Sequence, residues 1–348
     1  HEIDAMGVAH TVTLGAQARG DFLRPVSLHR TERRARYATV RRDEVTETGT
    51  GLFAEAQSRW RPWLRTTLGV RGDAYTFDVT SDRPENSGTR TAAIASPKAS
   101  IALAPGRNTE LYLSGGLGFH SNDARGTTIT VDPVTGDAAS RVDPLVRSRG
   151  AEVGLRANPL RGFRSTIAVW ALELDSELLF VGDGGTTEPS DRSRRSGVTF
   201  ANFYRPIPQL SLDADVSVSR ARFTSVPSAE DHIPGALERV VTGGVTWNNG
   251  RATGPFGALR VRHFGAYPLI EDNSVRANGS TLVNADAGFF VRGARVQFTV
   301  LNLLDERAND IQYFYESRLS GEAGSGMSDI HFHPVEPRQV RVSLAWGL

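Results

Sequence analysis

The most chemically suggestive stretch of the sequence is DIHFHPVEP, residues 329–337. If this stretch is extended, His331 and His333 lie on one face, because alternate side chains of a strand point the same way. Two imidazoles so placed, with Glu336 close by, suit contact with a transition metal or a metal chelate. The alternative is structural: the two histidines bond only to neighbouring loops. We name these three residues as candidate ligand contacts and assign no metal site.

Three further polar clusters stand where predicted strands run into long loops: FHSNDARG at 119–126, VGDGG at 181–185 and IEDN at 270–273. Their candidate ligand-binding side chains are His120, Asn122, Asp123, Arg125, Asp183, Glu271 and Asp272. Asn, Asp and Gly also form turns, so loop structure is the alternative role for each cluster. The glycines around Asp183 are interpreted as a turn rather than a phosphate cradle, because no helix is predicted after them.

Catalysis finds little support in the sequence. The 348 residues include no cysteine, which excludes disulfides, thiolate metal sites and cysteine catalysis. Neither a Gly-X-Ser-X-Gly elbow nor a His-Glu-X-X-His helix occurs. The net charge of +1 provides no positive electrostatic field that would attract nucleic acid. We predict no enzyme, no cofactor and no nucleic-acid partner; the nearest enzymatic alternative is an outer-membrane hydrolase with a serine–histidine pair.

The dominant pattern of the chain is period-two alternation, as in LSLDADVSVSR at 210–220. One parity holds leucine, alanine and valine and the other serine and aspartate, so a strand here has one apolar and one polar face. The pattern recurs often enough to predict about fourteen strands, most of them longer than usual in soluble sheets. We place these strands near 7–19, 47–59, 64–79, 91–103, 109–121, 146–157, 163–181, 193–204, 209–223, 237–248, 255–267, 278–290, 294–302 and 336–347.

Short and long connections between the predicted strands alternate along the chain. Short ones are predicted at 61–63, 104–108, 158–162, 205–208, 248–254 and 291–293. Long polar ones are predicted at 20–46, 80–90, 122–145, 182–192, 224–236, 268–277 and 303–335. Tight turns at one end and long loops at the other are typical of an outer-membrane barrel. No run of about 18 apolar residues occurs, so no membrane-spanning helix is predicted.

Aromatic residues collect near the ends that carry the short turns, as expected at a membrane–water boundary. They are Trp60, Trp63, Phe163, Phe203, Tyr204, Trp247, Phe289, Phe290 and Trp346. The apolar faces are therefore predicted to touch lipid and the polar faces to line a lumen. Predicted lipid-facing residues are Leu212, Val216, Val296, Val342 and Leu344, and predicted lumen residues are Asp213, Asp215, Gln297 and Arg341.

Three segments resemble TonB-dependent outer-membrane receptors. SPKASIALAPGRNTELYLSGGLGFHSNDARGTT at 96–128 resembles the paired strands that follow a Ser-Pro-Lys/Arg entry, and FTVLNLLDERAND at 298–310 resembles an Asn-Leu-Phe-Asp strand exit. EPRQVRVSLAWGL at 336–348 resembles the closing strand. The chain departs from these patterns with Leu304 in place of the usual phenylalanine and Leu348 in place of the final aromatic residue, although Trp346 lies two places earlier.

The resemblance implies an all-β fold, an antiparallel up-and-down transmembrane β-barrel. Such receptors have about 22 strands around an N-terminal plug, together with a segment that contacts TonB. Residues 1–348 supply about fourteen strands and neither other part, so we expect a single barrel domain, the C-terminal portion of the receptor barrel, without a plug domain.

The implied function is uptake, at the bacterial outer membrane, of a bulky scarce ligand such as an iron–siderophore or another metal chelate. The implied partners are outer-membrane lipid and lipopolysaccharide, the imported ligand and, in the full-length receptor, the TonB complex. Two alternatives stay open: a passive channel of about fourteen strands, and a soluble β-rich binding or adhesion protein. A closed small barrel requires the strand near 7–19 to pair with the strand near 336–347.

Overall fold

A computed structural model of the chain describes residues 2–5, 7–176, 178–181, 186–250, 253–319, 321, 324 and 326–346. It is all-β, with one helix of five residues, α1 (Ala124–Thr128), and two 3-10 turns, η1 (Pro84–Asn86) and η2 (Ser228–Glu230), among these residues. No helix in the described ranges is long and apolar enough to cross a membrane.

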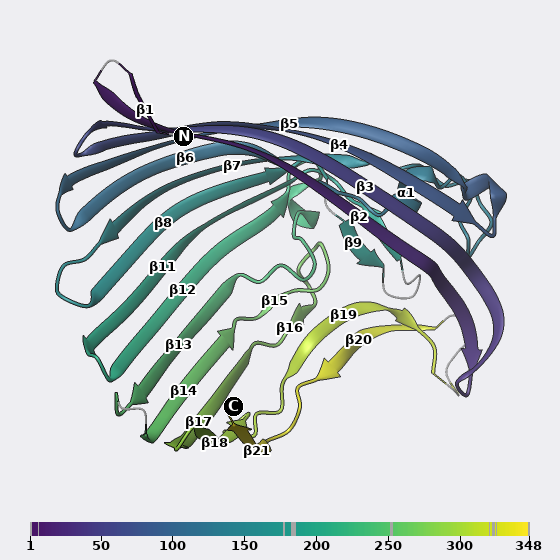
Figure 1. Cartoon of the computed structure of the whole chain (residues 1–348). Coiled ribbons are helices and arrows are strands. Elements are labelled where there is room, and N and C mark those ends of the chain that lie inside the picture. The colour runs from purple at the N-terminus through teal and green to yellow at the C-terminus, as the bar shows by residue number, and fades with distance from the viewer. Residues whose placement is uncertain are drawn as a thin grey trace. The chain divides into compact units, whose positions relative to one another are not determined.

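One sheet joins fifteen of the described strands, almost all in chain order (Figure 1). Its members, in hydrogen-bonded order, are β1 (Glu2–Ala5), β2 (Val8–Glu32), β3 (Ala35–Arg61), β4 (Leu64–Ser81), β5 (Gly88–Gly106), β6 (Thr109–Ser121), β7 (Leu145–Ala157), β8 (Phe163–Leu174), β11 (Ser193–Ile207), β12 (Leu210–Phe223), β13 (Arg239–Asn248), β14 (Gly254–Phe264), β17 (Ser280–Val291), β18 (Ala294–Leu301) and β21 (Gln339–Trp346). Small two-stranded sheets are formed by β9 (Leu178–Val181) with β10 (Thr186–Pro189), β15 (Tyr267–Pro268) with β16 (Arg276–Ala277), and β19 (Asn309–Ser317) with β20 (Met327–Pro334).

The predicted all-β antiparallel meander is confirmed. Each of the fourteen predicted strands corresponds to a member of the large sheet, and only β1 adds to them. Each described pairing is antiparallel, and from β3 onward short turns between consecutive members alternate with longer connections.

Three predicted segments differ most from the structure. The loop predicted over 20–46 is mostly strand, because β2 and β3 continue to a two-residue turn at 33–34. This stretch lacks an apolar face, so periodicity could not reveal it. The strand predicted over 163–181 ends at Leu174, and β9 is a separate element. The predicted loop over 303–335 holds the β19–β20 hairpin.

The described residues form two compact units. One consists of 1–103, 113–151 and 172–193, and the other of 104–112, 152–171 and 194–348. In the second unit, cross-strand register sorts the side chains into alternating rows. One row is wholly apolar: Leu212, Val245, Leu259, Ala285, Val300 and Val340. The row on the opposite face is largely polar: Ser211, Thr246, Ala258, Asp286, Thr299 and Arg341.

The apolar rows are exposed in the isolated chain. Val245 exposes 40% of its surface, Leu259 46% and Val340 67%. The first unit repeats the arrangement with Leu14, Ala54, Val70 and Pro97 in register across β2 to β5. A soluble fold would bury such continuous rows in its core, since large exposed apolar patches mark surfaces that meet another apolar phase.

The rows give a matched pair of substitutions. We expect Val245→Arg to reduce the free energy of unfolding by about 2–4 kcal/mol in lipid, because it places a charge in the apolar row. Thr246→Arg, on the polar row, should change it by less than about 1 kcal/mol. Denaturant unfolding in lipid vesicles measures both values, and equal losses at the two positions would contradict the face assignment.

Candidate functional site

The candidate site residues lie among the long connections, and the first unit holds one group of them. The connection 122–144 is closed at its base by Asn122, which is 3% exposed. Its amide Nδ2 donates to the Asp143 carbonyl at 2.6 Å, and its backbone N–H donates to the Pro144 carbonyl at 3.0 Å. Asn122 therefore holds the loop closed and has little surface left for a ligand.

The loop folds back onto β3 and β4 through a small apolar core. Val45, Phe77, Val79 and Ala124 are buried together, and Tyr75 and Leu145 pack against them. A second clamp comes from the buried Asn86. Its Oδ1 accepts from the backbone N–H groups of Thr130 and Val131, and its Nδ2 donates to the Val131 carbonyl. Such packing gives a polar loop a fixed shape.

Asp123 and Arg125 form the charged part of this group. Asp123 caps α1 by accepting from the Arg125 backbone N–H at 2.9 Å, and its carboxylate also accepts from the Arg125 guanidinium at 2.6 Å. The buried pair Arg41–Asp43 on β3 is close enough to act on both charges. Burial opposes ionisation of Asp123, but the hydrogen bonds and charge of Arg125 and the charge of Arg41 hold its pKa below the ordinary value.

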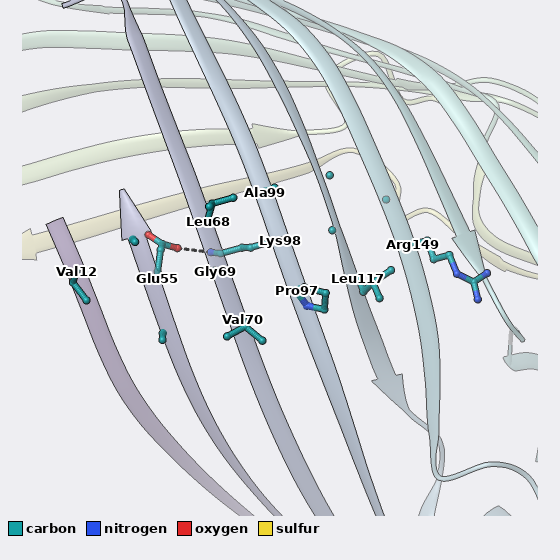
Figure 2. Close-up of a pocket in the computed structure, with 15 residues that line it drawn as sticks. Val12, Glu55, Leu68, Gly69, Val70, Pro97, Lys98, Ala99, Leu117 and Arg149 are labelled. Carbon is teal, nitrogen blue, oxygen red and sulfur yellow. Dashed lines mark ion pairs between the residues drawn. The ribbon is translucent and has the colours of Figure 1, made fainter. Parts of the chain in front are cut away.

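Further ion pairs cover the polar face of the first unit below this loop. Arg71 and Asp73 are joined at 2.6 Å along β4. Lys98, the only lysine of the chain, reaches Glu55 at 2.6 Å. Figure 2 shows Lys98 extending across Gly69 to Glu55. A Cβ atom at position 69 would lie 2.8 Å from Lys98 Cε, so glycine leaves room for the lysine side chain that crosses it.

A groove of about 810 Å³ lies on the same strands, but its lining argues against a polar ligand. Most lining residues are small or apolar, among them Val12, Ala54, Leu68, Val70 and Ala99 (Figure 2). They belong to the parity of the apolar rows. We assign the groove to the face predicted to touch lipid.

The second unit holds Glu271 and Asp272 in a packed cap of two connections. The Glu271 carbonyl accepts from the His232 backbone N–H at 3.0 Å, and Ile233 and Leu269 are buried nearby in the chain. The side chain of Asp272 accepts from the backbone N–H of Ser274 at 2.8 Å, which lowers the pKa of that exposed carboxyl. Asp272 thus forms a turn, although both carboxylates remain exposed.

His331 and His333 lie on one face of the β19–β20 hairpin, as predicted for a strand. His331 stacks on Tyr315 with ring centroids 3.7 Å apart, and its Nε2 lies 2.6 Å from Ser317 Oγ. His333 Nδ1 lies 2.8 Å from an oxygen of Asp310. Glu336 lies just beyond β20 and accepts from Gln339 at 2.9 Å. Asp310 orients the exposed His333 ring through its Nδ1 atom.

The candidates therefore fall into separate groups. His120 is partly buried on β6, beside Asn122 in the first unit, and Asp183 lies outside the described residues. The described residues contain no group of three or more His, Asp or Glu side chains that could hold a metal ion. Sequence reasoning missed Asn86 and the Arg41–Asp43 pair, for which no local motif exists.

A long antiparallel meander with apolar rows on one face and ion pairs on the other is the pattern expected of strands that cross a membrane. A family model described as TonB dependent receptor-like, beta-barrel matches residues 3–303, so the chain belongs to this family. Members of the family are transporters, not enzymes. A comparison with curated proteins found no match.

Solved structures share the fold at low sequence identity. The ferric yersiniabactin uptake receptor FyuA from Yersinia pestis is 16% identical with a TM-score of 0.69, over 98% of this chain and 51% of that one. The ferric-catecholate import receptor Fiu from K12 E. coli is 13% identical with a TM-score of 0.71, over 99% and 52%. The copper transporter OprC is 15% identical with a TM-score of 0.70, over 97% and 54%. The chain spans about half the length of these proteins.

The lowered pKa of Asp123 predicts an acid-sensitive loop. Because the folded-state pKa lies below the unfolded value of about 3.9, the stabilisation is complete above that pH and is lost as the pH falls through the folded pKa. Amide exchange at Gly126 and Ile129, corrected for intrinsic rates, should therefore lose protection only below about pH 4. Asp123→Asn should remove this pH dependence. Equal pH profiles for the two proteins would show that Asp123 does not hold the loop.

Proposed function

We propose that this chain forms part of the membrane-spanning barrel of an outer-membrane receptor that imports a bulky, scarce ligand, such as an iron–siderophore or another metal chelate. The observation that carries the proposal is the register of apolar and polar rows in a chain of the TonB-dependent receptor family. The solved structures with this fold include a ferric yersiniabactin receptor, a ferric-catecholate receptor and a copper transporter. TonB would supply the energy in the full-length receptor.

We further propose that residues 1–348 are the C-terminal portion of a larger barrel. In the hydrogen-bonded order β1 and β21 are the terminal members, and β21 pairs with β18. Lipid cannot satisfy the backbone groups of an edge strand, so further strands would have to pair there.

The ligand would meet the loop end of the strands, where the candidate side chains lie. His331, His333 and Asp310 present two imidazoles and a carboxylate from one hairpin. Tyr313 and Tyr315 share the same face, because they alternate along β19 and face His331 and Asp329 across the hairpin. An aromatic and imidazole surface suits a planar or metal-bearing chelate, which offers both rings and exchangeable ligand positions.

Ligand binding tests the function directly. The five tryptophans provide a fluorescence signal for titration of the detergent-solubilised chain with ferric hydroxamate, ferric catecholate, ferric citrate and copper chelates. We expect saturable binding of at least one class. The absence of saturable binding for all four classes would contradict the import proposal.

The histidine pair has its own test. For a chelate that the chain binds, His331→Ala with His333→Ala should weaken binding by at least about tenfold, equivalent to about 1.4 kcal/mol. The matched control is Glu316→Gln with Ser328→Ala, a cross-strand pair on the opposite face of the same hairpin. Unchanged affinity in the histidine variant, with both variants folded, would reduce His331 and His333 to loop structure.

A further inference from the structure

A pocket of about 700 Å³ lies at the short-turn end of the second unit. The turn at 107–108, the turn at 158–162 and the end of β11 form its walls. Its polar lining consists of two carboxamides and three guanidinium groups: Asn108, Asn158, Arg161, Arg164 and Arg205. None of the described residues that line it is acidic. We call this site the arginine pocket.

Backbone hydrogen bonds tie the walls of the arginine pocket together. The Asn158 N–H donates to the Asn108 carbonyl at 2.7 Å, and the Arg205 N–H donates to the Gly162 carbonyl at 2.8 Å. Gly162 has a φ of +79°, and a Cβ atom there would lie 2.3 Å from the Arg205 carbonyl oxygen. Glycine is therefore required for this close approach of the two chains. The backbone forms the pocket before any ligand arrives, as is usual for small-molecule sites.

The guanidinium groups of the arginine pocket lack acidic partners. Arg161 and Arg164 form no ion pair and no side-chain hydrogen bond within the described part of the chain. Arg205 Nη2 donates to the Pro208 carbonyl at 2.7 Å, and Arg205 has no ion pair with a described residue either. Three positive charges therefore line one pocket without compensation, and most of their N–H donors are available to a ligand.

Arg164 and Arg205 belong to the polar face of the sheet. Arg164 has the same parity along β8 as Trp170, whose Nε1 donates to Thr199 Oγ1 at 3.2 Å. Thr199 Oγ1 lies 3.2 Å from the hydroxyl of Ser217, which alternates with the apolar residues of β12. Arg205 has the same parity along β11 as Thr199. The arginine pocket is therefore separate from the apolar rows.

Arginines elsewhere on the polar face of the second unit have partners. Arg156 lies 2.8 Å from Glu110, and Arg260 lies 2.6 Å from Asp213. The Arg295 guanidinium lies over the ring of Phe256, 4.7 Å from its centroid. The arginine pocket departs from this arrangement. Such a departure is what an anion site requires, because a bound anion supplies the missing negative charges.

The lining of the arginine pocket selects the class of ligand. Concave sites of about 300–1,000 Å³ take small molecules. Guanidinium groups bind carboxylate and phosphate oxygens through paired hydrogen bonds. The exposed side chains of Leu160 and Phe203 add an apolar wall beside them. We propose that the arginine pocket binds a small organic polyanion, which carries several carboxylate or phosphate groups on a flat apolar body. This site does not depend on the imported ligand.

The test is equilibrium dialysis of the whole chain in neutral detergent with benzene-1,3,5-tricarboxylate and with benzene-1,3,5-trisphosphate. The two probes share a ring and differ in their anionic groups, so the more tightly bound probe identifies carboxylate or phosphate as the preferred group. We expect saturable binding of at least one of them. Phloroglucinol, the uncharged parent of the trisphosphate, should bind at least tenfold more weakly than that probe.

A pair of matched variants locates the site. Arg161→Gln with Arg164→Gln should weaken binding of the preferred probe at least tenfold and reduce its salt dependence. The variant should keep its fold, because neither side chain has a partner within the described part of the chain. The control is Arg59→Gln with Arg292→Gln, which changes the net charge equally at exposed positions of other short-turn ends. It should retain affinity within twofold.

Four results would overturn the proposal. They are the absence of saturable binding for both anionic probes, equal losses in the two variants, equally tight binding of phloroglucinol, and binding of a glutamate-rich peptide when both small probes fail. The last result would show that the pocket is a contact for another protein. Circular dichroism of both variants verifies that they keep the strand content of the unmodified chain.

Discussion

The backbone hydrogen-bond register is the constraint on which this structure depends. Side chains alternate with a period of two, so a fixed register aligns Leu212 with Val245 and Leu259 on one face and Asp213 with Arg260 on the other. A slip of one residue in any strand would put a charge among the valines and leucines. The long ladders of this sheet hold that register over many residues, and two very different environments can then be kept on its two sides.

The polar face satisfies its charges internally. Asp213 accepts from Arg260 at 2.6 Å across two strands, and Asp286 accepts from Gln297 and Thr299. In the first unit, Arg71–Asp73 and Lys98–Glu55 do the same. Exposed pairs of this kind contribute little stability each. Their effect is to pair charges with one another on the face that would line a lumen.

The alternation of apolar and polar residues predicted the strands well, because a strand with one apolar and one polar face shows this pattern within its own sequence. The limits of β6, β12 and β18 follow the pattern closely. The same reasoning failed at 20–46, where both faces are polar and the partner strand alone supplies the order. The structure of the loops could not be predicted, for a related reason. Asn86 and Val131 meet through folding of two distant connections, which no spacing in the sequence records.

For the candidate site, sequence reasoning located side chains but not their partners. The common face of His331 and His333 follows from the period of a strand, yet their contacts with Tyr315, Ser317 and Asp310 depend on how the hairpin pairs. Asn122 and Asp123 were selected for ligand chemistry, and the structure gives both a role in closing and capping their loop. Polar residues at strand ends can bind ligands or hold loops in shape. Only their hydrogen-bond partners in the folded chain show which of the two roles a residue has.

A cysteine scan can distinguish the two faces of the sheet, because the chain contains no cysteine of its own. Single cysteines introduced from position 212 to 217 sample both faces of β12 in lipid bilayers. We predict that a water-soluble maleimide labels positions 213, 215 and 217, whereas a lipid-attached quencher reaches only probes at 212, 214 and 216. Labelling and quenching that do not alternate along the strand would contradict this prediction.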